Sequence, residues 1–192
     1  MDQALRETAA HPGEVITLFE DEVSFYRQPS QAWLWAYLGR RQPRLPYSHR
    51  ANTLMRVVGL LNAATGQVHA WDFSHVTADR LARCFQQIGR LYPNALRIYL
   101  VLDNWPVHFH PKVQAALAAD PRIHLLPLPT YSPWLNPIEK LWRWIKQRVT
   151  HAHPWSDDFL AFKEQIRTEL QQFAFGSDDL LQYCGIVQLI SL

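Results

Sequence analysis

Apolar positions recur along this chain with two different periods, and the change of period separates predicted strands from predicted helices. Residues Val15–Tyr26 alternate in polarity and are rich in β-branched and aromatic side chains, which favours a strand. Residues 32–38 and 54–61 have the same character. The segment Val68–Phe73 either extends this hairpin or forms a short additional strand. The first part of the chain is therefore predicted to be a meander of three strands.

The second part of the chain alternates between helical and strand-like patterns. In residues 78–92, Leu81, Phe85 and Ile88 recur at three- and four-residue steps, as on one face of a helix. A short apolar run at 98–102 suits a strand that is buried on both sides of a sheet. The remaining predicted elements are a helix at 112–119, a strand at 123–128, a proline-dense loop at 127–137 and helices at 137–150 and 156–173.

This order of elements predicts an α/β fold in which helices flank a mixed five-stranded sheet. It is the order of ribonuclease-H-like folds, which brings the middle of the first strand beside the end of the strand at 98–102. A helix after the last strand then presents a third group to the same edge. With 192 residues, of which 48% are hydrophobic, the chain can bury a substantial core, so residues 1–192 are predicted to form a single domain.

Composition excludes several classes of protein. No run approaches the roughly 18 consecutive apolar residues that a membrane span needs. The charged start of the chain does not resemble a signal peptide, so we expect a soluble, cytoplasmic protein. Cys84 and Cys184 lie far apart and outside any Cys/His pattern at zinc-ligand spacing. They are expected to be reduced, buried thiols, and no His-based metal site is indicated.

The formal net charge of +2 does not by itself indicate a nucleic-acid partner, but the positive charge is unevenly distributed. Two stretches each contain four basic residues and no acidic one. These residues are Arg40, Arg41, Arg44 and Arg50 in the first stretch, and Lys140, Arg143, Lys146 and Arg148 in the second. Either stretch could be a solvated face. Because both flank candidate acidic sites, contacts with DNA phosphates are the favoured interpretation.

One candidate acidic group lies inside the first predicted strand, in Phe19-Glu20-Asp21-Glu22. Because side chains alternate along a strand, Glu20 and Glu22 must point to the face opposite Asp21. Only one side of this cluster can therefore form a site. The alternative is that all three acids lie on a solvated strand edge, since an unpaired carboxylate in a core would be costly.

Two further candidate acids lie at the ends of later elements. Asp103 ends the apolar run 98–102, where α/β folds generally place ligand chemistry, although Asp-Asn also favours an Asx-turn. Glu139 lies in Asn136-Pro137-Ile138-Glu139, which carries the signals of a helix start with Asn136 as N-cap. The alternative for Glu139 is the reciprocal half of a capping box with Asn136.

Three convergent carboxylates suit one kind of chemistry in particular. DNA phosphodiesters are commonly cleaved with two metal ions about 4 Å apart, one activating the attacking oxygen and one stabilising the leaving oxygen. Magnesium prefers oxygen ligands, so Asp21, Asp103 and Glu139 are predicted to hold two Mg²⁺ or Mn²⁺ ions. Arg143 and Lys146 share a helical face with Glu139, which indicates either phosphate contacts or ordinary surface pairing.

The segments around the last two acids are more specific than the acids alone. Asp103-Asn104-Trp105-Pro106-Val107-His108, and Tyr131-Ser132-Pro133 followed by Leu135-Asn136-Pro137-Ile138-Glu139, resemble the second and third catalytic motifs of DDE transposases. The resemblance is to the mariner-like and related bacterial insertion-sequence families and covers roughly residues 17–150. The 35 residues between Asp103 and Glu139 are close to the interval typical of that family. Trp105 departs from the pattern, which more often has a small residue there.

The resemblance implies an enzyme, the catalytic domain of a transposase. Such a domain is an endonuclease that cuts DNA at transposon ends and transfers the resulting 3′-hydroxyl strand to target DNA. Asp21, Asp103 and Glu139 would be its catalytic metal ligands, and His108 would bond to a phosphate or to a metal-bound water. The alternatives are a ribonuclease-H-like nuclease without strand transfer and a decayed, non-catalytic DNA-binding or assembly protein.

The resemblance also sets expectations about partners. Family members usually carry helix-turn-helix DNA-binding modules before the first catalytic aspartate, and only 20 residues precede Asp21. We therefore expect these modules to be absent and to be supplied by a separate polypeptide or a frameshifted fusion. Synapsis of two transposon ends makes a homodimer the family expectation. The setting would be a bacterial cytoplasm, with the protein at the nucleoid when it is bound to DNA.

Overall fold

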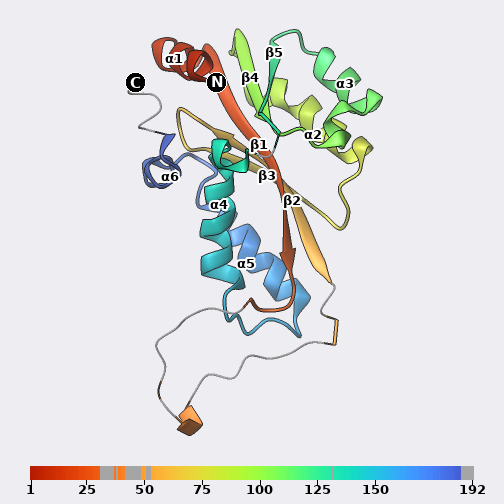
Figure 1. Ribbon diagram of the computed structural model, residues 1–192, viewed down its shortest axis with the longest axis vertical. Coiled ribbons are helices and arrows are strands. Elements are labelled where there is room, and N and C mark those ends of the chain that lie inside the picture. Colours follow the sequence, from red (N-terminus) through yellow and green to blue (C-terminus); the bar gives the residue numbers. More distant parts are fainter. Residues whose placement is uncertain (31–36, 38, 42–48, 51–52, 131, 187–192) are drawn as a thin grey trace.

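The centre of the fold is one five-stranded sheet, shown in the computed structural model of Figure 1. The structure describes residues 1–30, 37, 39–41, 49–50, 53–130 and 132–186. The strands lie in the order β3-β2-β1-β4-β5. Their bounds are Val15–Tyr26 for β1, Leu54–Asn62 for β2, Val68–Phe73 for β3, Arg97–Leu102 for β4 and Ile123–Pro127 for β5.

The first strand, β1, occupies the middle of this sheet and pairs on both sides. It runs antiparallel to β2, with Asp21 opposite Gly59, and parallel to β4, with Phe19 opposite Val101. Asp103 lies two residues beyond Val101, just as Asp21 lies two residues beyond Phe19. The parallel register therefore brings these two aspartates to the same part of the sheet, which is what the order of elements predicts.

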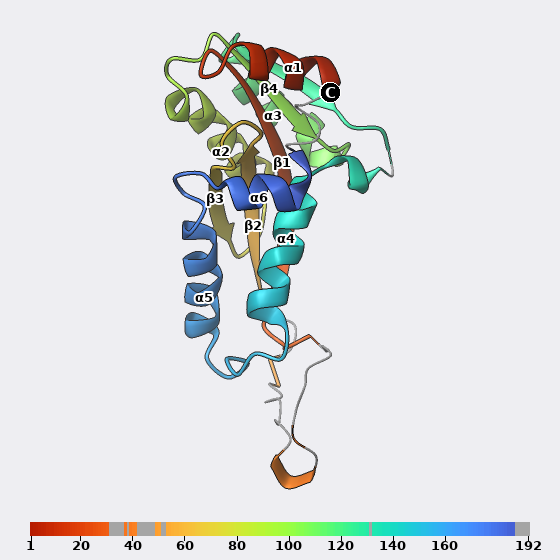
Figure 2. The same ribbon diagram turned by 90° about the vertical axis from the view of Figure 1, so that its left-hand side faces the viewer.

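Helices cover both faces of the sheet (Figures 1 and 2). One face carries α2 (Ala78–Leu91) and α3 (Pro111–Ala118). The other carries α4 (Ile138–Ile145), α5 (Phe159–Gln171) and α6 (Asp178–Cys184), while α1 (Asp2–Ala10) packs against β1. Because the side chains of β1 alternate, one strand contributes to a hydrophobic core on each face.

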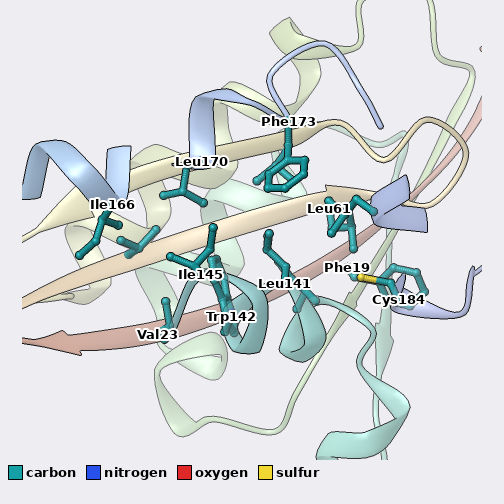
Figure 3. Packing of buried hydrophobic residues seen from close by; sticks show 14 of the residues in the cluster. Phe19, Val23, Leu61, Leu141, Trp142, Ile145, Ile166, Leu170, Phe173 and Cys184 are labelled. Atoms are coloured by element: carbon teal, nitrogen blue, oxygen red, sulfur yellow. The ribbon is translucent and has the colours of Figure 1, made fainter. Parts of the chain in front are cut away.

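Each face of the sheet has its own buried apolar cluster. Figure 3 shows the cluster under α4 and α5, where Phe19, Trp142 and Ile166 are fully or almost fully buried. The cluster under α2 and α3 includes Leu18 and Phe85. Phe19 and Leu18 are neighbours on β1 and point to opposite cores, which is the alternation expected of a strand that is covered on both sides.

The observed elements agree with most of those predicted from periodicity. The meander consists of β1, β2 and β3, so the segment at Val68–Phe73 is a strand of the sheet. The predicted strand at 32–38 lies outside the described residues. The helix predicted at 137–150 is α4 followed by a π-helical turn at Lys146–Thr150. The short helices α1 and α6 were not predicted from periodicity, because neither is long enough for a clear amphipathic repeat.

The mixed sheet, with helices on both faces, is the ribonuclease-H-like fold that the element order predicts. None of the helices in the described part of the chain combines the length and the apolar composition needed to cross a bilayer.

Candidate active site

Three acidic side chains from three separate elements line one cavity of about 290 Å³. Asp21 comes from the middle of β1, Asp103 follows the end of β4, and Glu139 lies in the first turn of α4. The structure therefore brings together the three acids that the sequence singles out, although 81 residues separate Asp21 from Asp103 in the sequence.

Asp21 is held in a largely buried position against α4. Its Oδ2 accepts a hydrogen bond of 2.9 Å from Nε1 of Trp142. Burial, followed by the negative charges of Glu139 and Glu22, raises the pKa of Asp21 to about 8. An acid with such a pKa holds a proton at neutral pH, and a cation in the cavity would favour its ionised form.

Asp103 is more exposed, and its carboxylate is fixed by two donors. Its Oδ1 accepts a hydrogen bond of 2.8 Å from the backbone N–H of Trp105, and Nδ1 of His108 lies 3.3 Å from the same oxygen. The hydrogen bond from His108 is the main reason that the pKa of Asp103 lies below its usual value. The Asx-turn considered for Asp103 does form, and it leaves this side chain on the cavity wall.

Glu139 projects from the start of α4 into solvent. Among the described residues it has no hydrogen-bonding or ion-pair partner. The predicted capping role of Asn136 is wrong: the N-cap position is Pro137, and the Asn136 amide is buried and donates instead to the backbone carbonyl of Glu20. Glu139 therefore has no capping box to complete, and its carboxylate remains available to a ligand in the cavity.

The donor atoms of the three carboxylates suit divalent cations. They offer only oxygen atoms, the donors that Mg²⁺ and Mn²⁺ prefer. No choice of one oxygen from each residue brings all three within 4.8 Å of one another, so they do not converge on a single point. Oxygens that bind two ions about 4 Å apart can lie up to about 8 Å from each other.

His108 is buried behind this cavity and connects β1 to the end of β4. The ring is 1% exposed, and Nε2 lies 3.2 Å from Glu20 and 3.3 Å from Glu22. Nδ1 lies 3.1 Å from the backbone oxygen of Asp103. Burial acts to lower the pKa of His108, but the bonds to Asp103, Glu20 and Glu22 outweigh it and raise the pKa to about 12.

This burial corrects the interpretation of His108 as a contact to phosphate. Both ring nitrogens face protein oxygens, so the imidazolium is not presented to DNA. Its charge instead neutralises acids on the hidden face of β1. The sequence places the His108 motif correctly but does not reveal the direction of the ring, because that depends on Glu20 and Glu22, more than 80 residues away.

Glu20 and Glu22 lie on the face of β1 opposite Asp21, as side-chain alternation requires. The alternative of a solvated strand edge is wrong, because Glu20 is fully buried in the central strand. Burial raises the pKa of both glutamates. In the described part of the chain, Glu20, Glu22 and His108 are the one group whose ligand atoms lie close enough together for a single metal ion, a grouping that sequence spacing does not predict.

A larger cavity with basic side chains in its walls, here called the cationic groove, adjoins the acidic cavity. Its volume is about 950 Å³, and its walls include Glu139, Lys140, Arg143 and Lys146 from the exposed side of α4 and its π-helical extension. Lys140 donates a hydrogen bond of 3.0 Å to the backbone oxygen of Cys184. Glu139, Arg143 and Lys146 are all exposed and line this cavity together.

The first basic stretch, which contains Arg40, Arg41, Arg44 and Arg50, is described only in part. Arg40 lies in a short 3-10 helix, Gly39–Arg41, and is exposed. The side chain of Arg41 and the whole of Arg44 lie outside the described residues.

The fold and the cavity define a class of protein, the ribonuclease-H-like enzymes with acidic active sites. The family model of the DDE superfamily endonucleases matches residues 17–159, and this chain belongs to that family. The match begins just before Asp21 and ends after Glu139, so it includes all three elements that line the acidic cavity.

Individual relatives agree with this assignment. The uncharacterized 39 kDa protein of insertion element IS630 from Shigella sonnei is 26% identical over 163 residues, which are 84% of this chain and 46% of that protein. The Mos1 transposase in its paired-end complex with the left transposon end has a similar fold. Its TM-score is 0.67 at 17% identity, with 99% of this chain and 59% of that chain covered.

The isolated catalytic domain of Mos1 mariner transposase is also similar. It has a TM-score of 0.56 at 15% identity, with 99% of this chain and 86% of that chain covered. This chain therefore spans about half the length of the curated relative and most of the catalytic domain of the structural one.

Proposed function

We propose that this chain is the catalytic domain of a transposase and that it cuts DNA at transposon ends and transfers the cut strand to a target. The observation that carries the proposal is the cavity lined by Asp21, Asp103 and Glu139 beside a cationic groove. Family membership and the similar fold of the Mos1 complexes support it. Residues 1–192 form one catalytic domain in this proposal.

Two Mg²⁺ or Mn²⁺ ions are the proposed cofactor. The donors fit, because all three side chains are carboxylates that line one cavity, and they are not grouped tightly enough to be a site for a single ion. When bound, the ions would supply activation of the attacking oxygen and stabilisation of the leaving oxygen. Mos1 paired-end complexes are known with Mg and with Mn, which supports the same choice here.

The protein's own contribution is to place charge and to hold the reacting groups. Asp103 stays ionised because His108 and the Trp105 N–H stabilise its negative charge. Asp21 lies deeper, against the indole of Trp142, and its raised pKa keeps it mostly protonated at neutral pH unless a cation lies nearby. Glu139 stands at the mouth of the groove, where it can join a ligand that arrives with the DNA. The site is thus completed by substrate and cation together.

DNA is the proposed substrate, and its backbone would follow the groove beside α4. Lys140, Arg143 and Lys146 line that groove, and cations on one helical face can bind successive phosphates without reading base sequence. Arg40, Arg41 and Arg44 are further proposed phosphate contacts, in the other basic stretch. Phosphate contacts alone do not select transposon ends, so we propose that a helix-turn-helix module on a separate polypeptide or frameshifted fusion recognises them. A homodimer that holds two transposon ends is also part of the proposal.

Nicking of supercoiled plasmid tests the enzyme assignment. We expect the protein to nick DNA when Mg²⁺ or Mn²⁺ is present and not in EDTA. Asp103→Asn and Glu139→Gln should each reduce nicking to the metal-free level, because each removes a charged ligand. Glu14→Gln is the control, since Glu14 is an exposed acid just before β1 and outside the cavity. Equal residual nicking in all four proteins would contradict the assignment and favour a non-catalytic DNA-binding protein.

Strand transfer separates a transposase from a simple nuclease. The substrate is a precleaved transposon-end duplex with a free 3′-hydroxyl, mixed with a labelled target plasmid. Covalent joining of the two DNA molecules supports the proposal. Cleavage of the same duplex without any joined product would instead identify a ribonuclease-H-like nuclease.

A further inference from the structure

Trp142 combines a core position with a polar contact to the candidate active site. Its side chain is 2% exposed and lies in the apolar cluster under α4 (Figure 3). Its Nε1 nevertheless donates a hydrogen bond of 2.9 Å to Oδ2 of Asp21. We propose that Trp142 is a positioning residue, whose indole N–H holds the Asp21 carboxylate in the orientation that binds a divalent cation. This inference rests on the proposed function only in taking Asp21 as a metal ligand.

The sheet contains a slot that fits this indole. Gly59 on β2 is paired directly with Asp21 on β1. A Cβ atom at position 59 would lie 2.4 Å from Cη2 of Trp142, so any larger residue there would collide with the ring. The indole therefore lies over Gly59 and reaches across to the neighbouring strand. The absence of a side chain opposite Asp21 is what allows the N–H to reach the carboxylate.

Packing alone does not require the nitrogen. Phe25, also on β1, meets the indole edge to face at a centroid distance of 6.4 Å, and a phenylalanine at position 142 could make the same kind of contact. A buried N–H, in contrast, needs an acceptor, and a carboxylate is a strong one. With Oδ2 fixed by this bond, the carboxylate group has a defined orientation at the cavity wall.

The same anchor fixes the rotation of α4. Glu139 precedes Trp142 by three residues and therefore lies on a neighbouring part of the helical surface. While the indole occupies the slot over Gly59, α4 cannot rotate about its axis without pulling the ring out of that slot. Trp142 thus positions two of the three acids, Asp21 by a hydrogen bond and Glu139 through the helix.

Trp144 on the same helix provides a natural comparison. It packs edge to face against Phe173 and Tyr183, with centroid distances of 6.0 and 4.9 Å. Its Nε1 is buried but has no hydrogen-bond partner among the described residues. Replacing either tryptophan by phenylalanine removes one indole from α4. Only the change at position 142 removes a hydrogen bond to a candidate metal ligand.

The test is Mn²⁺ binding by the full chain, followed through the electron paramagnetic resonance signal of free Mn²⁺. Trp142→Phe should weaken binding by about 10- to 100-fold, the range observed when partners that orient metal ligands are removed. Trp144→Phe should leave the affinity unchanged. In the nicking assay, Trp142→Phe should need more Mn²⁺ for half-maximal rate and should recover rate at high Mn²⁺, whereas a merely misfolded fraction would lower the rate at every concentration.

A second variant addresses loss of packing. Benzothienylalanine at position 142 keeps the shape of the indole but replaces the N–H with sulfur, so it should fold and should show the same weakened Mn²⁺ binding. Unchanged Mn²⁺ affinity in this variant, or equal weakening in Trp144→Phe, would overturn the proposal.

Asp21→Asn distinguishes this inference from the proposed function itself. If the wild-type protein binds Mn²⁺ and loses that binding in Asp21→Asn, the metal site stands and the variants at position 142 decide the role of the indole. If the wild-type protein binds no Mn²⁺ and does not nick DNA, the proposed function fails together with the inference.

Discussion

Asp21 and Asp103 line the same cavity, yet their surroundings shift their pKa values in opposite directions. Burial, with help from Glu139 and Glu22, raises the pKa of Asp21 to about 8. The hydrogen bond from His108 is the first cause of the lowered pKa of Asp103. Without a cation, the site therefore holds one protonated and one ionised aspartate at neutral pH. Binding of cations is then expected to release a proton from Asp21.

The raised pKa of Asp21 predicts how stability depends on pH. The folded-state pKa lies above the unfolded-state value of about 4, so folding takes up a proton. The stability that the folded protein gains from protonated Asp21 is fully present below about pH 4 and is lost as the pH rises through about 8. Asparagine does not titrate, so metal-free Asp21→Asn should melt above the wild type at pH 9, by at least about 2 °C.

Thermal melting from pH 5 to pH 9, with and without Mg²⁺, checks this prediction. Mg²⁺ should raise the melting temperature of the wild-type protein at high pH, because it pairs with the ionised carboxylate. It should have less effect on Asp21→Asn. Glu14→Gln controls for loss of an exposed acid. Parallel pH profiles for the wild type and Asp21→Asn would show that Asp21 does not titrate in this range.

At the scale of elements, α4 combines the functions of the site. It carries Glu139 toward the acidic cavity, and it places the indole of Trp142 over Gly59 of the sheet, with its N–H on Asp21. Its outer side, with the π-helical turn that follows, presents Arg143 and Lys146 to the larger groove. One helix therefore contributes a core anchor on its buried side and, on its exposed side, a candidate metal ligand next to the proposed phosphate contacts.

The groove beside α4 predicts a measurable dependence of DNA binding on salt. Changing Arg143 and Lys146 together to glutamine should weaken binding to duplex DNA. It should also reduce the slope of log K against log[salt] by about 2, because each lost phosphate contact accounts for about 0.9. The control pair is Arg83→Gln with Arg90→Gln, two exposed cations on α2, on the opposite face of the sheet.

Fluorescence anisotropy of a labelled duplex across a salt series measures both slopes. An unchanged slope for the α4 pair, or an equal loss for the α2 pair, would place the DNA elsewhere on the molecule.

Elements and acids with strong local signals could be predicted from the sequence. The order of elements predicted that the middle of β1 lies beside the end of β4, and the parallel pairing of these strands does bring Asp21 and Asp103 together. Glu139 was found through its motif and its place at a helix start. These features depend on the order and period of residues close together in the chain, which a sequence displays directly.

Contacts between distant segments could not be predicted in the same way. Asn136 looked like a helix cap, but its Nδ2 donates to the backbone carbonyl of Glu20, and its Oδ1, the atom that would cap the helix, has no hydrogen-bond partner among the described residues. His108 looked like a phosphate contact, but Glu20 and Glu22 surround its ring. In both cases the partner is on β1, and only the tertiary structure brings it close.

At the scale of the whole molecule, one sheet separates two apolar cores. The core under α2 and α3 contains Phe85, and the core under α4 and α5 contains Phe162. The site depends on both cores. Asp21 lies in β1 and Asp103 directly follows β4, and these two strands contribute side chains to both cores. Glu139 lies on α4, which packs only against the core under α4 and α5. A substitution that destabilises either core is therefore expected to disturb the site as well, because both cores pack against the same strands.

Matched cavities in the two cores test whether the chain unfolds as one unit. Phe85→Ala and Phe162→Ala each remove an almost completely buried ring, and each should lower the free energy of unfolding by about 3–5 kcal/mol. Because β1 contributes to both cores, each variant should still unfold in one transition, with tryptophan fluorescence and far-ultraviolet circular dichroism giving the same midpoint in urea. Separate midpoints in Phe162→Ala would mean that α4 and α5 detach from the sheet independently. In that case Glu139 would be lost from the site while β1 and β4 remained folded, and Mn²⁺ binding would fall at urea concentrations below the main transition.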